Sequence, residues 1–305
     1  MSANFTSALA ASAEAASGQH YPQGTLYLVA TPIGNLADIS LRALYVLGLV
    51  DLVACEDTRH TQALLRAYGI DKTSAQLLAL HQHNEAQAAQ SVVDHLRQGR
   101  RVAYVSDAGT PGVSDPGARL VAAVQMQQLR CMPLPGPSSV ITVLCAAGVV
   151  QDQSSGFVFA GFLPAKAAER ERAVLGLVDE VRAVVLLEAP HRMEALALAL
   201  ASLGARMVTV GRELTKQFEE IATVAAQDLT VWLAQDANRL RGEFALVVHP
   251  AAASAPTESD SRVLQLLLAH LPLKTAVKLA AEITGEPRNA LYQTALTLKQ
   301  GGPQE

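Results

Sequence analysis

The sequence predicts an α/β protein with two α/β domains followed by a small helical domain. Short apolar runs rich in β-branched and aromatic residues recur along residues 24–250, and each leads into a loop of small residues and then a helical pattern. The chain of 305 residues is half apolar and 17% charged, so it can bury more than one core. A linker rich in Ala, Ser and Pro, residues 251–261, precedes a helical tail, residues 262–305.

The first half of the chain predicts a mostly parallel sheet. Residues 1–23 are rich in Ala and Ser and lack Lys and Arg, so they predict a disordered leader rather than a signal peptide. Strands are then predicted at 24–30, 50–55, 101–105 and 129–134. Their alternation with helical patterns implies crossover connections. Ligands bind at the carboxyl ends of such strands.

A second set of β-rich runs follows, at 156–162, 182–188, 206–210 and 243–250. Between the two sets, "PSSVITVLCAAG" predicts a helix that Pro137 and a capping Ser138 introduce. We therefore expect an N-terminal domain over 24–135 and a second domain over 136–250.

The tail is basic within an acidic chain. The whole chain has a formal charge of −4, whereas residues 262–300 hold five basic and two acidic residues. Two helical patterns meet at "TGEPRN", where Gly285 can end one helix and Pro287 can begin the next. This pattern resembles a helix-turn-helix, although a helical hairpin that packs on the body fits it equally.

Several classes of protein are excluded by what the sequence lacks. No apolar run approaches the roughly 20 residues that span a bilayer, and the three separated cysteines form no C-x-x-C pair, which suits the cytoplasm. The phosphate-binding G-x-x-x-x-G-K-[ST], the dinucleotide-binding G-x-G-x-x-G and the hydrolase G-x-S-x-G are absent. The negative net charge means that any nucleic acid must be held by a local basic patch.

Nine blocks of sequence, in order and spacing, carry a resemblance. They are "TLYLVATPIGNLADIS", "CEDTRHTQALL", "HNE", "SDAGTPGVSDPG", "PGPSS", "GFLP", "EAPHR", "RELTKQFEE" and "GEFALVV". Together they resemble the tetrapyrrole-methylase superfamily, and more closely its branch that methylates small-subunit ribosomal RNA. The resemblance implies two α/β domains with a cofactor cleft between them, S-adenosylmethionine as cofactor, and a homodimer. It also implies 2′-O-methylation of a cytidine in the decoding region of 16S rRNA.

The loop "SDAGTPG" corresponds to one that lies against the cofactor in this family. The resemblance implies that Asp107 and Thr110 meet the cofactor, while glycines keep the backbone close. A tight turn capped by Asp107 is the structural alternative. Asp115 is expected either to join the site or to cap the helix that Pro116 begins.

Three further residues match cofactor positions of the family, and two more are expected beside them. Ser138 and Ser139 correspond to residues whose hydroxyls and amides contact the cofactor, and a capping role for Ser138 is compatible with this. Ile33 matches an apolar position of the first loop. Leu187 and Ala245 are expected as walls for the adenine, although buried strands need such residues in any case.

Catalysis is assigned to polar residues that a generic fold does not need. A ribose hydroxyl is a poor nucleophile until it is deprotonated, so a base and good alignment should help. The candidates are Glu188, at the exit of one strand, and Glu213 and Lys216 in "RELTKQFEE". Lys216 could act as base or hold a phosphate. A solvated cluster of ion pairs is the alternative.

Three basic residues are expected to contact RNA: Arg59 and His60 in "EDTRH", and Arg192 in "EAPHR". No metal site is expected. His81, His83 and Glu85 match only a structural block, and transfer from a sulfonium needs no metal.

Two other functions remain open at this stage. A methylase that acts on a corrin or porphyrin carbon shares the superfamily, but generally lacks "DTRHT", "EAPHR" and a basic tail. A ribosome-assembly factor without catalysis could keep the fold and bind RNA, and the intact cofactor loops argue against it.

Overall fold

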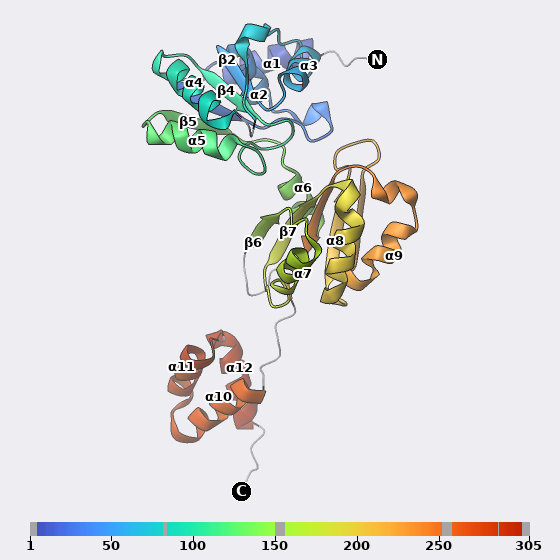
Figure 1. Cartoon of the computed structure of the whole chain (residues 1–305). Helices are drawn as coiled ribbons and strands as arrows, with labels where there is room; N and C mark the ends of the chain where they lie inside the picture. Colours follow the sequence, from blue (N-terminus) through green and yellow to red (C-terminus); the bar gives the residue numbers. More distant parts are fainter. Residues whose placement is uncertain (1–4, 82–83, 150–155, 252–257, 286, 301–305) are drawn as a thin grey trace. The chain divides into compact units, whose positions relative to one another are not determined.

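Two five-stranded sheets organise the first of the two units into which the chain divides, Met1–Pro250 and Ala251–Glu305 (Figure 1). A computed structural model describes residues 5–81, 84–149, 156–251, 258–285 and 287–300. The strands are β1 (Thr25–Val29), β2 (Leu52–Cys55), β3 (Leu77–Ala79), β4 (Val102–Val105), β5 (Arg130–Leu134), β6 (Phe157–Gly161), β7 (Ala183–Glu188), β8 (Met207–Arg212), β9 (Glu220–Ala225) and β10 (Phe244–Val248). The α-helices are α1 (Thr6–Ala16), α2 (Leu41–Leu49), α3 (Thr58–Ala67), α4 (Glu85–Arg97), α5 (Gly117–Met126), α6 (Ser139–Ala146), α7 (Ala167–Leu175), α8 (Met193–Leu200), α9 (Leu229–Ala234), α10 (Glu258–His270), α11 (Leu273–Thr284) and α12 (Arg288–Gln300).

The first sheet has the order β3-β2-β4-β1-β5, and every pairing is parallel, as predicted. Its strands are apolar along their length because both faces are covered. In β1, Leu26 packs with α4 and α5, whereas Tyr27 and Val29 pack with α2 and α3. Strand β3 was not predicted, since its three half-buried residues are too few to show a period.

The loops after β1 and β4 diverge from each other. The loop after β1 leads to α2 on one face of the sheet, and the loop after β4 leads to α5 on the other. Thr31 and Gly109 join the two loops through a pair of backbone hydrogen bonds of 3.0 and 2.9 Å. Gly109 has φ +80°, which few other residues adopt. Adjacent strands with diverging connections leave a crevice, and ligands bind there in open α/β sheets.

The second sheet has the order β6-β7-β10-β8-β9 and is mixed, with only β6 and β7 parallel. Helices α7, α8 and α9 cover one face, and α6 packs on the other. The prediction of α6 is confirmed, and the Ser138 hydroxyl accepts a hydrogen bond from the Ile141 amide at 3.5 Å. Strand β9 was not predicted because it is a half-exposed edge that depends on pairing with β8.

The prediction of a disordered leader over residues 1–23 differs from the structure. Residues 6–16 form α1, whose Ala-rich sequence favours helix. The ring of Phe5 packs edge-on against Tyr68, with 4.8 Å between ring centroids, and Leu9 joins the same core. The backbone oxygens of Tyr21 and Pro22 accept further side-chain hydrogen bonds. These contacts involve residues far along the chain, so the local sequence did not reveal them.

The second unit consists of α10, α11 and α12, and it has its own apolar core, formed by Leu264, Val277, Ala280, Leu291 and Ala295. Gly285 ends α11 as predicted, in the left-handed conformation at φ +77°. Helix α10 begins at Glu258, inside the predicted linker 251–261, which is therefore shorter than expected. Among the helices of the described residues, none is both long and apolar enough to cross a membrane.

Candidate functional site

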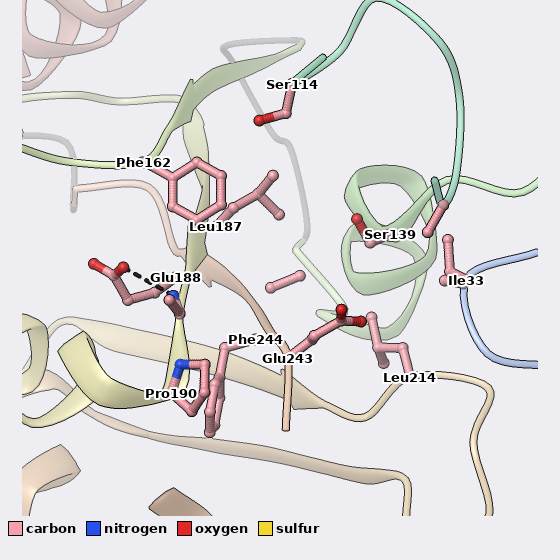
Figure 2. A pocket seen from close by; sticks show the side chains of 13 residues that line it. Ile33, Ser114, Ser139, Phe162, Leu187, Glu188, Pro190, Leu214, Glu243 and Phe244 are labelled. Atoms are coloured by element: carbon pink, nitrogen blue, oxygen red, sulfur yellow. Dashed lines mark hydrogen bonds between the residues drawn. The ribbon is translucent and has the colours of Figure 1, made fainter. Parts of the chain in front are cut away.

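Two adjoining pockets lie at the strand ends of the first unit. The first has a volume of about 440 Å³ and the second about 210 Å³. Four residues line both pockets, so the two form one continuous space: Ala108, Ser114, Ser139 and Leu187. Figure 2 shows the first pocket, with Ile33 and Leu214 approaching from one side and Phe162 and Leu187 from another.

All of the residues predicted to bind the cofactor line these pockets. Those in the first pocket are Ile33, Ser139, Leu187 and Ala245. Those in the second are Asp107, Thr110, Ser138, Ser139 and Leu187. Residues separated by more than two hundred positions are thus brought together, because loops from both sheets converge here.

The first pocket has an apolar wall. Strands β7 and β10 pair antiparallel with Leu187 opposite Ala245, and both residues belong to the face that α6 covers. The short Ala245 side chain leaves room beside Leu187. Ile33, only 9% exposed, and Leu214 complete the wall. A flat apolar ring fits such a surface.

The second pocket is lined by polar groups, and some of these groups already form hydrogen bonds within the protein. The Thr110 hydroxyl donates to the Pro137 carbonyl at 2.8 Å and so ties its loop to the start of α6. Asp107 is exposed, and its carboxylate accepts the Asp57 amide at 3.2 Å. Its other lone pairs remain available for a ligand.

Asp115 acts within its own loop. One carboxylate oxygen accepts the Tyr104 hydroxyl at 2.9 Å and the Gly117 amide at 2.7 Å, and the other accepts the Gly112 amide at 2.7 Å. Gly117 is the first residue of α5 and Pro116 is its N-cap, so Asp115 holds the first amide of the helix from the preceding residue while it also lines the second pocket.

The charge of the pockets has one sign. Their lining includes the acids Glu56, Asp107, Asp115, Glu188 and Glu243. Among the described residues that line them, there is no Lys, Arg or His. A space with this lining attracts a cation and repels a phosphate.

Binding of a cationic ligand should therefore weaken in acid. Burial raises the pKa of Glu56, its hydrogen bond from the Asp107 amide opposes this, and the negative charges of Asp107 and Asp115 raise it further. Glu56 is ionised above its pKa and neutral below it, so a fall in pH removes negative charge from the pocket. We expect calorimetric affinity for the cationic S-adenosylmethionine to fall as the pH is lowered from neutral through the raised pKa of Glu56, and Glu56→Gln to flatten that slope. An identical slope in the variant would contradict this role of Glu56.

Lys216 forms a charged cluster with two glutamates. Its Nζ donates to Glu213 Oε1 at 2.8 Å and to Glu243 Oε2 at 3.1 Å. Burial alone would lower the pKa of Lys216, but the two ion pairs outweigh it and raise the pKa. Burial would likewise raise the pKa of Glu213, and its bonds to Lys216 and to the Glu243 amide lower it instead. Lys216 is therefore cationic, which disfavours the alternative of a neutral amine base.

The loop that carries this cluster is strained. Glu213 has φ +51° and Thr215 has φ +67°, values that cost free energy in residues other than glycine. Gly34 of the first loop packs so closely on Lys216 that a Cβ at that position would lie 2.3 Å from Lys216 Cγ. The Asn35 amide also donates to the Thr215 hydroxyl at 3.1 Å. The loop after β8 is thus held against the loop after β1.

Glu188 and Arg192 pair with each other. Arg192 Nε lies 3.1 Å from Glu188 Oε1, and the guanidinium also donates to the Leu163 carbonyl. Glu188 is only 3% exposed, and its Oε2 atom has no hydrogen-bond partner among the described residues. Figure 2 shows Glu188 directed away from Leu187. These contacts orient Arg192, and its contact with RNA stays a prediction.

Arg59 and His60 do not line the pockets. They lie in the first turn of α3, where the Asp57 carboxylate accepts both backbone amides, at 2.8 and 3.4 Å. The Arg59 side chain is 91% exposed and pairs with Asp57 at 3.2 Å. This exposure makes the Arg59 side chain accessible to a large ligand. The ion pair with Asp57 does not prevent such a contact, because a surface ion pair of this kind is weak.

Sequence reasoning missed several residues of the site, among them Glu56, Phe162, Leu214 and Glu243. Each stands in or beside a block that had been singled out, but no local pattern separates a pocket residue from its neighbours. The described residues contain no cluster of three or more His, Cys, Asp or Glu suited to a metal ion. His83 lies outside the described residues.

The fold and the site define a methylase of the tetrapyrrole type. Residues 25–230 match the family described as Tetrapyrrole (Corrin/Porphyrin) Methylases. Residues 254–299 match the RsmI C-terminal HTH domain, in agreement with the helix-turn-helix pattern of the tail.

Comparison with curated relatives shows to which group of these methylases the chain is similar. The chain is 47% identical over 278 residues to ribosomal RNA small subunit methyltransferase I of Escherichia coli O157:H7, covering 90% of this chain and 95% of that protein. It is 47% identical over 281 residues to the protein of the same name from Pseudomonas aeruginosa, covering 90% and 97%. The chain therefore belongs to the tetrapyrrole methylase family, within the group of the ribosomal RNA small subunit methyltransferases I.

Solved structures bear out the fold. A cobalt precorrin-4 methyltransferase is similar with a TM-score of 0.55 and 18% identity, covering 76% of this chain and 98% of that chain. A uroporphyrin-III C-methyltransferase from Thermus thermophilus is similar with a TM-score of 0.53 and 21% identity, covering 74% and 94%. At these identities the likeness concerns the fold alone.

Proposed function

We propose that this protein transfers a methyl group from S-adenosylmethionine to the ribose 2′-oxygen of a cytidine in the decoding region of 16S rRNA. The observation that carries the proposal is the acid-lined double pocket at the strand ends, in a chain 47% identical to small-subunit rRNA methyltransferases. We further propose that it acts in the cytoplasm, as a homodimer, on 16S rRNA or on the small ribosomal subunit.

The lining of the pockets fits S-adenosylmethionine. The molecule has a flat adenine, a hydroxylated ribose, and an amino-acid end whose ammonium and sulfonium leave it with a net positive charge. Leu187, Ala245 and Ile33 offer an apolar surface for the ring. Asp107 and the hydroxyl of Ser139 offer acceptors for hydroxyl and ammonium hydrogens. The absence of a basic side chain from the described lining favours a cation over a nucleoside phosphate.

Bound S-adenosylmethionine supplies a methyl group on a positively charged sulfur. The residues of this chain must then place the ribose oxygen in line with the methyl carbon and exclude water. The acids of the pocket keep RNA phosphates out, so the ribose and base of one nucleotide can enter while the backbone stays at the rim.

Lys216 is the residue we propose to meet the substrate at that rim. Its cationic Nζ, held by Glu213 and by the Glu243 carboxylate of the pocket lining, can bind the phosphate beside the target ribose and stabilise negative charge on the attacking oxygen. Glu213 stays ionised because its pKa is lowered, so its role is to orient Lys216.

Mapping of methyl groups tests the proposal. Small ribosomal subunits from cells that lack the gene are incubated with the protein and isotopically labelled S-adenosylmethionine, and 2′-O-methylated nucleotides are located on the 16S rRNA. Label at one cytidine of the decoding region is the expected result. Label on a tetrapyrrole but not on RNA would favour the corrin or porphyrin alternative, and cofactor binding without transfer to RNA would overturn the proposal.

The five basic residues of the stretch 262–300 should supply much of the RNA affinity, although residues 251–305 as a whole also hold five acidic residues and are formally neutral. Residues Ala251–Glu305 form a unit with its own core, so truncation after Pro250 should leave the fold and cofactor binding intact. RNA binding should weaken, and each lost phosphate contact should lower the slope of log affinity against log salt by about 0.7 to 0.9. Filter binding over a salt series measures this. Equal affinity and slope in the truncated protein would assign the tail a packing role only.

A further inference from the structure

Phe162 is an exposed aromatic residue in the lining of the first pocket. The residue is 50% exposed, whereas Phe244 in the same lining is only 3% exposed. Figure 2 shows the Phe162 ring beside Leu187. The aromatic ring pairs found among the described residues do not include it. Single exposed hydrophobic residues are common, but an exposed aromatic ring in the lining of a pocket is available to stack on a flat ligand group.

A β-bulge directs this ring toward the pocket. In the parallel pair of β6 and β7, Phe159 lies opposite Val185 but Gly161 lies opposite Leu186, so β6 contains one extra residue. Gly161 takes the left-handed φ of +64° that such a bulge requires. Side chains alternate between faces, so in a regular strand Phe162 would point to the face opposite Phe159. The extra residue returns Phe162 to the face of Val185, on which the pocket lies.

The surroundings of Phe162 restrict what it can contact. The acids Glu56 and Asp107 of the adjoining pocket, which form no ion pair among the described residues, make this space unfavourable for phosphates. A phenylalanine ring offers no hydrogen bond, but its face attracts any flat ring. In the proposed binding mode the adenine already has an apolar wall at buried Ala245 and half-buried Leu187, whereas Phe162 is 50% exposed. The open face therefore suits a base that arrives from solvent.

We propose that Phe162 is the platform on which the unpaired base of the target nucleotide stacks when its ribose enters the pocket. This inference rests on the proposed RNA methylation and names a residue that positions its substrate. Proteins that read single-stranded RNA commonly stack unpaired bases on aromatic side chains. Stacking here would fix the ribose relative to the methyl group without any positive charge in the acidic pocket.

Four variants test the proposal in the full-length protein. Phe162→Ala and Phe162→Leu should each lower kcat/KM for small ribosomal subunits by about 5- to 150-fold, the range measured for loss of one aromatic-base stack. Phe162→Tyr should keep most of the activity, because it restores a ring. Phe157→Ala is the matched control, since Phe157 lies on β6, the strand directly before Phe162, is 38% exposed and does not line the pocket, and it should behave as the unaltered protein.

Calorimetry with S-adenosylmethionine shows whether Phe162 contacts the adenine of the cofactor or the base of the target nucleotide. Unchanged cofactor affinity in Phe162→Ala, together with the loss in kcat/KM for RNA, supports the proposal. A loss of cofactor affinity that accounts for the kinetic change would overturn it, as would an equal loss in Phe162→Tyr or full activity in Phe162→Leu. Each comparison is made against the unaltered protein on the same subunits, so failure of that protein to methylate RNA would be recognised as failure of the proposed function.

Discussion

Replacing Lys216 by alanine is expected to lower kcat for methylation of small ribosomal subunits by about 100-fold or more, while affinity for S-adenosylmethionine stays unchanged. Loss of one group that stabilises charge at a reacting oxygen typically costs about 100- to 1,000-fold in kcat. Lys216 itself does not line the pockets, and its removal leaves the Glu243 carboxylate of the lining ionised, so a cationic cofactor keeps its negatively charged surroundings. Single-turnover kinetics at saturating cofactor measure the rate, and calorimetry measures the affinity.

Two further variants separate the charge of Lys216 from its packing. The aliphatic part of the side chain lies against Gly34, and Lys216→Met keeps that contact without the charge. It should be as inactive as the alanine variant but as stable to heat as the unaltered protein. Lys216→Arg keeps the charge and should retain part of the activity. Full activity in Lys216→Met would remove Lys216 from the catalytic residues.

Replacing Asp107 by alanine is expected to weaken binding of S-adenosylmethionine by about 5- to 150-fold, which corresponds to about 1 to 3 kcal/mol for a ligand donor left without its acceptor. Asp107 lines the second pocket and is exposed, so its carboxylate becomes covered only when the ligand binds. Asp107→Asn keeps an acceptor for the Asp57 amide but loses the charge. Its affinity for S-adenosylmethionine should therefore lie between that of the unaltered protein and that of Asp107→Ala. Calorimetry at constant ionic strength measures all three affinities.

A matched control excludes a general effect of charge. Asp71 is also exposed and does not line either pocket, and Asp71→Ala changes the net charge by the same amount. It should bind the cofactor as the unaltered protein does. If Asp107→Ala binds equally well, the carboxylate does not belong to the cofactor site and its role is to accept the Asp57 amide of the neighbouring loop.

The cofactor pocket was largely predictable because parallel strands place their exit loops at one edge of a sheet. "SDAGTPG" and "TPIGN" follow strands that turned out to be neighbours, β4 and β1, and Asp107 and Ile33 therefore line one continuous space. The resemblance to a family supplied the residues of the second sheet, Leu187 and Ala245. Helix α1 and strand β9 escaped prediction, since each is stabilised by a partner distant in sequence or by an edge pairing.

The sequence by itself determined where the chain turns and which loops are rich in glycine, hydroxyls and acids, because these are local properties of short segments. Only the tertiary structure decided which charged groups surround Lys216 and in which direction the Phe162 side chain points. Lys216 is cationic because Glu243, far along the chain, adds to the pairing with nearby Glu213. Phe162 faces the pocket because one extra residue in β6 shifts its register against β7, and register is a relation between two strands that neither strand's own pattern contains.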